Sequence, residues 1–308
     1  MARARTRQLY LPSAGILQDR IEQDLALNDW DEALELLVCL DTLGISSESH
    51  ALARQCVDLL RGRLGATFPS RARKLDPIAD AWAEVEALMG TRPELANDIL
   101  LQRLRIAWHK RFAVLLDRGS LGQVFRGQPA GWHHLQSGQP ALAEASLSAT
   151  VTRFPLEPDY WMMLARVRSQ LGLENAAQAW FGLLLVAPLR LPLPPEDDTE
   201  GQAFSTLPGW LQALYPEAAA LELPGDPRLW LPAIGLCQQV FTWEMVPGKP
   251  VWDGNGTPKA LSGIPGAFLS FYAMFEKAQK STGGQRWQVA EAKRSLQRLA
   301  PQLYARYF

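Results

Sequence analysis

The amino-acid sequence predicts an all-α protein built from pairs of helices. The stretch from Pro129 to Pro188 is similar to itself after a shift of 34 residues, which aligns Gly138 with Gly172 and Leu147 with Phe181. A repeat of this length made of helix pairs is typical of helical solenoids. Apolar residues also recur at three- and four-residue steps over most of the chain, which is the spacing of one helix face.

The composition is that of a folded protein. The chain has 308 residues, of which 47% are hydrophobic and 20% charged, so it can bury a substantial core as one elongated array or as two domains. The formal net charge of -1 gives no overall attraction to nucleic acid or to an anionic membrane. Basic residues gather at both ends and acidic residues in the middle, which we interpret as solvated surface.

The cysteines indicate a reducing compartment, and the apolar runs are too short to cross a membrane. Cys39, Cys56 and Cys237 are too few and too scattered for a disulfide framework or a zinc site. The longest apolar run, Trp180 to Leu189, has about half the length of a membrane-spanning helix. The Arg-rich start is not followed by the apolar region of a secretory signal. We therefore expect a cytoplasmic protein without a transmembrane segment.

The first part of the chain predicts a basic flexible lead and then three helices. The lead covers residues 1–12, and the helices cover residues 13–27, 29–44 and 47–63. Asn28 suits the left-handed residue of a tight turn between the first two helices. The apolar residues that follow Asn28 have the same spacing as those that follow Gly172, so this helix pair has the style of the repeat.

The middle of the chain predicts two further helices before the repeat, at residues 76–90 and 93–116. The second begins at Pro93, a favourable first position for a helix. After the repeat the composition changes to a Pro-rich, acidic stretch that is typical of a linker. The predicted domains are therefore a helical repeat domain at residues 13–189, a Pro-rich acidic linker at residues 190–206, and a C-terminal helical segment at residues 207–308 that packs on the repeats.

The C-terminal segment is irregular and rich in Pro and Trp. Short helices are predicted at residues 207–221 and 227–240. An aromatic and β-branched run, a Pro-Gly turn and a second such run then favour a small β-hairpin. The hairpin would pack on helices through Phe241, Trp243, Val251 and Trp252. Two helices close the chain, and Pro301 should interrupt the last one. This segment is either a cap on the repeats or an interface.

The second repeat, Pro158 to Leu191, resembles a unit of the tetratricopeptide (TPR) family. The residues that carry the resemblance are Trp161, Leu164, Ala165, Ala177, Phe181 and Pro188. Arg168 departs from the family pattern, which favours a large aromatic residue there. The preceding unit is weaker, because Gly127 stands where the family has Trp. The resemblance covers about a fifth of the chain and implies a TPR-like helix-pair solenoid.

Members of this family mostly act as scaffolds, adaptors or assembly factors that hold a peptide or helix of another protein. The resemblance thus implies a non-catalytic protein-binding role for this chain. The partner-binding residues that it implies are Trp132, Leu135, Asp159, Met162, Arg166, Ser169 and Gln170. Trp132 and Met162 have an alternative interpretation as core residues. The alternative function is an all-α enzyme with a pocket between the repeats and the C-terminal segment.

No motif in the sequence specifies a reaction, a metal or a cofactor. The stretch at 116–127 is similar to a glycine-rich phosphate loop, but no other kinase motif follows it. Asp253 and Asn255 lack the later residues of a calcium loop. The adjacent His133 and His134 project in different directions on a helix and do not form a metal motif. We predict no catalytic residues, and we regard nucleic-acid or membrane contact through the basic last helix as a weaker hypothesis.

Overall fold

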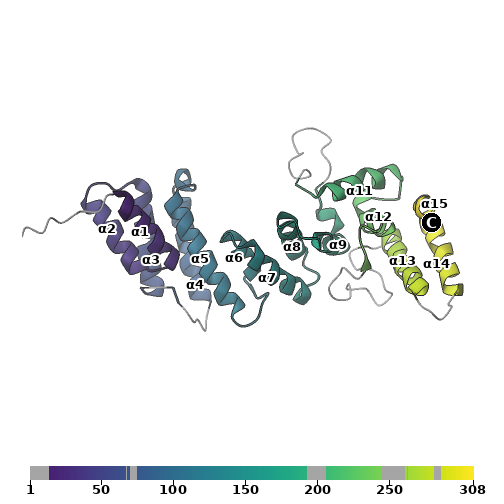
Figure 1. Cartoon of the computed structure of the whole chain (residues 1–308), viewed down its shortest axis with the longest axis horizontal. Helices are drawn as coiled ribbons and strands as arrows, with labels where there is room; N and C mark the ends of the chain where they lie inside the picture. Colours follow the sequence, from purple (N-terminus) through teal and green to yellow (C-terminus); the bar gives the residue numbers. More distant parts are fainter. Residues whose placement is uncertain are drawn as a thin grey trace, which may run out of the picture. The chain divides into compact units, whose positions relative to one another are not determined.

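The structure is a computed structural model of the chain. It describes residues 14–66, 68–69, 75–192, 206–243, 261, 263–280 and 286–308. These residues are helical almost throughout, so the all-α prediction is confirmed (Figure 1). The predicted lead and most of the predicted linker lie outside the described residues. Packing divides the chain into two compact units: unit 1 is Met1–Ser120 with Trp132–Gln139, and unit 2 is Leu121–Gly131 with Pro140–Phe308.

Unit 1 consists mainly of five helices, each close to its predicted place. They are α1 (Ala14–Leu27), α2 (Trp30–Thr42), α3 (Glu48–Leu64), α4 (Asp76–Gly90) and α5 (Ile99–Asp117). Consecutive helices from α1 to α4 pack against each other, and α5 packs against α1 and α3. Trp30, Trp108 and Phe112 are fully buried among them, so aromatic rings form the centre of this core.

The turn at Asn28 joins three parts of unit 1. Asn28 has the left-handed backbone predicted for it, with φ of 57°. Its carbonyl accepts a hydrogen bond from the Phe68 N–H at 3.4 Å, and its side-chain Nδ2 donates to the Ala107 carbonyl of α5 at 3.4 Å. The Trp30 N–H donates to the Ala66 carbonyl at 3.0 Å. The segment after α3 is thereby fixed beside the end of α1.

The start of α5 differs from the prediction. The chain makes only a short 3-10 turn at Pro93–Leu95 and begins the helix at Ile99. The carboxylate of Asp98 accepts hydrogen bonds from the N–H groups of Leu100 and Leu101 at 2.9 and 3.4 Å. An Asp side chain in this role is a strong helix start, and it decides the boundary over Pro93. Ile99, the first residue of the helix, is exposed.

Unit 2 begins with a two-stranded antiparallel hairpin, β1 (Val124–Phe125) and β2 (Gln128–Pro129). Arg126 and Gly127 have φ of 50° and 79°, the pair of left-handed residues that a tight hairpin turn uses. The glycine-rich stretch at 116–127 is therefore a helix end followed by a hairpin, which the sequence analysis did not predict. The hairpin that it predicted near residues 240–258 falls mostly outside the described residues.

The remaining helices of unit 2 follow the hairpin along the chain. Helix α6 (Ala130–Gln136) contributes Ala130 and Gly131 to unit 2 and its other residues to unit 1. The others are α7 (Pro140–Arg153), α8 (Pro158–Gln170), α9 (Ala176–Val186), η2 (Pro188–Arg190), α11 (Gly209–Ala220), η3 (Pro227–Trp230), α12 (Leu231–Cys237), α13 (Ile264–Lys280), α14 (Arg286–Leu299) and α15 (Pro301–Tyr307). In unit 2, α8 packs against α7 and α9, and α13 packs against α12 and α14. The predicted interruption at Pro301 is confirmed. Phe241 is buried and stacks on Phe181 of α9, with ring centroids 4.7 Å apart.

Helices α8 and α9 approach closely at one glycine. Trp161 of α8 is buried, and a Cβ atom on Gly182 of α9 would lie 2.5 Å from its ring. Leu164, Ala165 and Phe181 are fully buried in the same pair of helices. Glycine is therefore required at position 182, because any side chain would push α9 away from α8.

Candidate functional site

The predicted partner-binding residues of α8 lie on one side of that helix. Asp159, Met162 and Arg166 follow each other at steps of three and four, with Ser169 and Gln170 one turn further. Asp159, Arg166 and Gln170 are exposed, whereas Met162 and Ser169 are half-buried. Part of the Met162 side chain is thus accessible to solvent, and the rest is packed against neighbouring residues.

Two of these residues already have partners within unit 2. The Asp159 carboxylate lies 3.2 Å from Arg190 of η2, in an exposed ion pair. The Ser169 hydroxyl accepts a hydrogen bond from Nε1 of the buried Trp180 at 3.0 Å. Ser169 therefore also helps to join α8 to α9, so a substitution there would test structure as much as binding.

The other two predicted residues, Trp132 and Leu135, lie on α6 in unit 1, and both are half-buried. The Trp132 ring meets the His109 ring edge-on, with centroids 5.1 Å apart. Trp132 is therefore at least partly a packing residue, as its alternative interpretation stated. The seven predicted residues therefore belong to two units, with Trp132 and Leu135 in unit 1 and the five residues of α8 in unit 2.

Arg168, the residue that departs from the family pattern, is the centre of a buried polar network. Its Nε donates to the Glu144 carboxylate at 2.8 Å and its NH2 group to the Ser148 hydroxyl at 2.9 Å, both on α7. Its NH1 group donates to the Gln178 side chain of α9 at 3.0 Å. One guanidinium thus ties α7, α8 and α9 together in place of an aromatic ring.

A local pattern that the sequence analysis missed occurs twice in unit 2. Nε1 of Trp161 donates to the Pro155 carbonyl at 2.9 Å, and Nε1 of Trp230 donates to the Pro224 carbonyl at 3.0 Å. Both indoles are buried, and each follows its proline by six residues. The sequences PLEPDYW and PGDPRLW share both prolines and the tryptophan, so this pattern can be recognised in the amino-acid sequence.

Four polar side chains meet inside unit 1 where α5 and α6 pack. Nδ1 of His109 lies 2.9 Å from Nδ1 of His133, and Nε2 of His134 lies 3.0 Å from Asp117. The adjacent histidines do point to different partners, as predicted. Trp82, Trp108 and Trp132 pack around His109, with ring centroids 5.8, 5.3 and 5.1 Å from its ring.

Burial keeps the paired histidines neutral. It lowers the pKa of His109 to about 4, with a further decrease from the nearby Arg105. Burial also lowers the pKa of His133 to about 3, and the neighbouring histidines add to this effect. In a neutral pair one Nδ1 carries the proton and donates it to the other. Both rings are closed off from solvent, so the pair is suited to holding two helices together rather than to proton transfer with a substrate.

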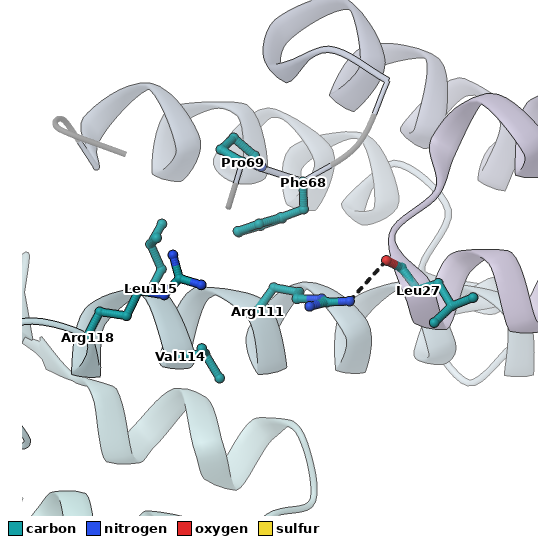
Figure 2. A pocket seen from close by; sticks show the side chains of 7 residues that line it. All are labelled: Leu27, Phe68, Pro69, Arg111, Val114, Leu115 and Arg118. Atoms are coloured by element: carbon teal, nitrogen blue, oxygen red, sulfur yellow. Dashed lines mark hydrogen bonds between the residues drawn. The ribbon is translucent and has the colours of Figure 1, made fainter. Parts of the chain in front are cut away.

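A hollow of about 200 Å³ opens on unit 1 between the end of α1, the segment after α3 and α5. Figure 2 shows its seven lining residues, which are Leu27, Phe68, Pro69, Arg111, Val114, Leu115 and Arg118. Three of them on α5, together with Arg118 at its C-terminal cap, are spaced as one face of a helix. Leu27 and Val114 are 64% and 43% exposed, which is high for apolar side chains.

The remaining candidates are metal ligands, membrane-spanning helices and cysteines. Among the described residues, no three His, Cys, Asp or Glu side chains are grouped as metal ligands. In the same part of the chain, every helix is too short or too polar to cross a membrane. Asp253 and Asn255 lie outside the described residues. Cys56 is buried and Cys39 and Cys237 are half-buried, all as free thiols.

Comparison of the chain with protein-family models, with curated proteins and with solved structures gives no significant match.

Proposed function

We propose that this chain is a non-catalytic scaffold or adaptor that binds another protein on a TPR-like array of helix pairs. The supporting observation is the recurrence of one helix-turn-helix geometry. Gly138 and Gly172, which the 34-residue shift aligns, both have left-handed backbones, with φ of 69° and 63°. Each N–H donates to the carbonyl three residues earlier, and the next residue closes the same turn onto the helix before it.

The residues after these turns support the same proposal. Leu147 and Phe181, nine positions after the two glycines, are fully buried. In unit 1, Asn28 is followed at the same distance by the fully buried Leu37. In helical solenoids, stacked helix pairs of this kind form an extended concave surface, and such surfaces bind peptides or helices.

The α8 face is the proposed binding surface. Asp159, Arg166 and Gln170 offer exposed polar groups around the half-buried Met162. A partner helix could place an apolar side chain against Met162 and charged groups against Asp159 and Arg166.

Site-directed photocrosslinking tests this function. A photoreactive amino acid at Met162 should crosslink one discrete protein in cells, and the charge reversal Arg166→Glu should reduce that product. The same amino acid at Thr152, an exposed residue of α7, serves as the matched control. Identical products from both positions, or no protein product from Met162, would contradict the proposal.

A further inference from the structure

We propose that the hollow of Figure 2 is a second protein-binding site, which receives an apolar side chain flanked by acidic residues of a partner. This site lies in unit 1 and does not depend on the α8 face. It is defined by an apolar floor and by two arginines at its edge.

Phe68, which forms the floor of the hollow, is anchored on the buried core of unit 1. The ring of Phe68 meets the buried rings of Trp30 and Trp108 edge-on, with centroids 6.2 and 6.4 Å apart. The backbone of Phe68 is fixed by its hydrogen bond to the Asn28 carbonyl. A surface anchored on the core in this way is preorganised, so a ligand loses little free energy in ordering it.

The size of the hollow indicates which ligand fits. Small-molecule and cofactor sites usually enclose about 300–1,000 Å³. A hollow of about 200 Å³ is smaller, and it suits one or two side chains of a peptide. Its apolar lining from Leu27, Pro69, Val114 and Leu115 favours an aliphatic or aromatic side chain over a nucleotide.

The charge at the edge indicates acidic neighbours. The charged residues among the described lining are Arg111 on α5 and Arg118 at its C-terminal cap, both exposed and about two helical turns apart. Arg111 donates to the Leu27 carbonyl at 3.3 Å, which fixes its guanidinium beside the end of α1 (Figure 2). A guanidinium has five N–H donors, so this bond leaves others for a carboxylate. An acidic, amphipathic peptide or helix therefore complements both the floor and the edge.

Selection from a library of short random-sequence peptides displayed on phage tests the proposal with the full chain. We expect enrichment of peptides in which a Leu, Ile, Met or Phe is flanked by Asp or Glu. Binding of the best synthetic peptide should weaken roughly tenfold in Arg118→Gln, as expected for the loss of one charge-assisted contact. It should also weaken as salt is raised.

Matched variants separate this site from general effects. Lys110→Gln removes a charge from an adjacent position of α5 that does not line the hollow, and it should leave affinity unchanged. Val114→Asp should abolish binding, whereas Val38→Asp, at a residue of similar exposure on α2, should not. Circular dichroism confirms that each variant is folded. Selected peptides that bind Val114→Asp and Arg118→Gln as well as the unmodified chain would overturn the proposal.

Two further outcomes would also overturn it. The first is enrichment of basic or uncharged peptides. The second is binding of single-stranded RNA or anionic vesicles that depends on Arg111 and Arg118, because it would assign the site to another class of ligand. The Met162 photocrosslinking experiment and the peptide-binding experiments measure different surfaces. Either proposal can therefore fail while the other stands.

Discussion

Nδ1 of His109 and Nδ1 of His133 face each other at 2.9 Å inside an aromatic core. Such a pair is stable only when one of the two nitrogens carries a proton and the other is an unprotonated acceptor. The pKa values of both rings lie below the value of 6.5 that an exposed histidine has. Folding of unit 1 should therefore depend on pH.

Acid should destabilise unit 1 before most carboxylates titrate. The pKa of His109 is about 4 in the folded protein and 6.5 in the unfolded chain. Between pH 4 and pH 6.5 the unfolded state therefore binds more protons than the folded state. The stability contribution is full above pH 6.5 and is lost as pH falls toward the folded pKa. His109 alone should lower the free energy of unfolding by about 2 kcal/mol between pH 7 and pH 5. Urea denaturation followed by circular dichroism measures this.

The double variant His109→Phe/His133→Phe should flatten that pH dependence, because phenylalanine does not titrate. His50→Gln, on α3, should keep it. An equal loss of stability in the unmodified chain and the double variant would show that other groups are responsible.

Loss of the Arg168 network should destabilise unit 2. Arg168→Met removes the guanidinium but keeps the length of the side chain, and it leaves Glu144, Ser148 and Gln178 without their shared donor. We expect a decrease of about 2–4 kcal/mol in the free energy of unfolding. In the double variant with Glu144→Gln the loss should be smaller than the sum of the two single losses, since no unpaired carboxylate remains. Additive losses would argue against a coupled pair.

Two glycines of unit 2 should respond in opposite ways to alanine. Gly182→Ala brings a Cβ atom to 2.5 Å from the Trp161 ring and should cost about 1–3 kcal/mol. Gly209→Ala, at the start of α11, meets no atom within 4 Å and should be neutral or slightly stabilising. Thermal denaturation of both variants is the measurement. Equal effects would mean that α8 and α9 are not in close contact.

The left-handed turns should be sensitive to alanine for a different reason. At Gly172, with φ of 63°, an added Cβ atom meets nothing within 4 Å, so the cost comes from the backbone alone. We expect Gly172→Ala to destabilise unit 2 by about 1 kcal/mol and Gly172→Asn by less. If alanine and asparagine cost the same, the turn does not keep its left-handed conformation.

Two thiols should resist alkylation in the folded protein. Burial raises the pKa of Cys56 and of Cys237 to about 12. The thiolate is the reactive form, and at pH 8 it is about one part in ten thousand for such a group. Mass spectrometry after iodoacetamide treatment should find both unmodified until denaturant is added. Rapid native labelling of Cys56 would contradict its burial.

Helix ends were the most predictable feature because their signals are local. Asn28 adopts the left-handed turn, Ser47 caps α3 through the His50 N–H, and Pro301 restarts the last helix. Two errors came from competing or weak local signals. Asp98 prevails over Pro93 at the start of α5, and strands of two residues at β1 and β2 are too short to produce alternation. The notable omission is the repeated Pro and Trp pattern before Trp161 and Trp230.

By itself, the sequence determined that the chain is all-α and where most helices begin and end, since hydrogen bonds and side-chain preferences within a few residues set these features. Only the tertiary structure decided what the unusual side chains do. His109 meets His133, Arg168 meets Glu144, and Phe68 reaches the hollow beside Arg111 because packing brings residues from different helices together. No local pattern specifies those pairings, because they depend on how the buried faces of whole helices fit one another.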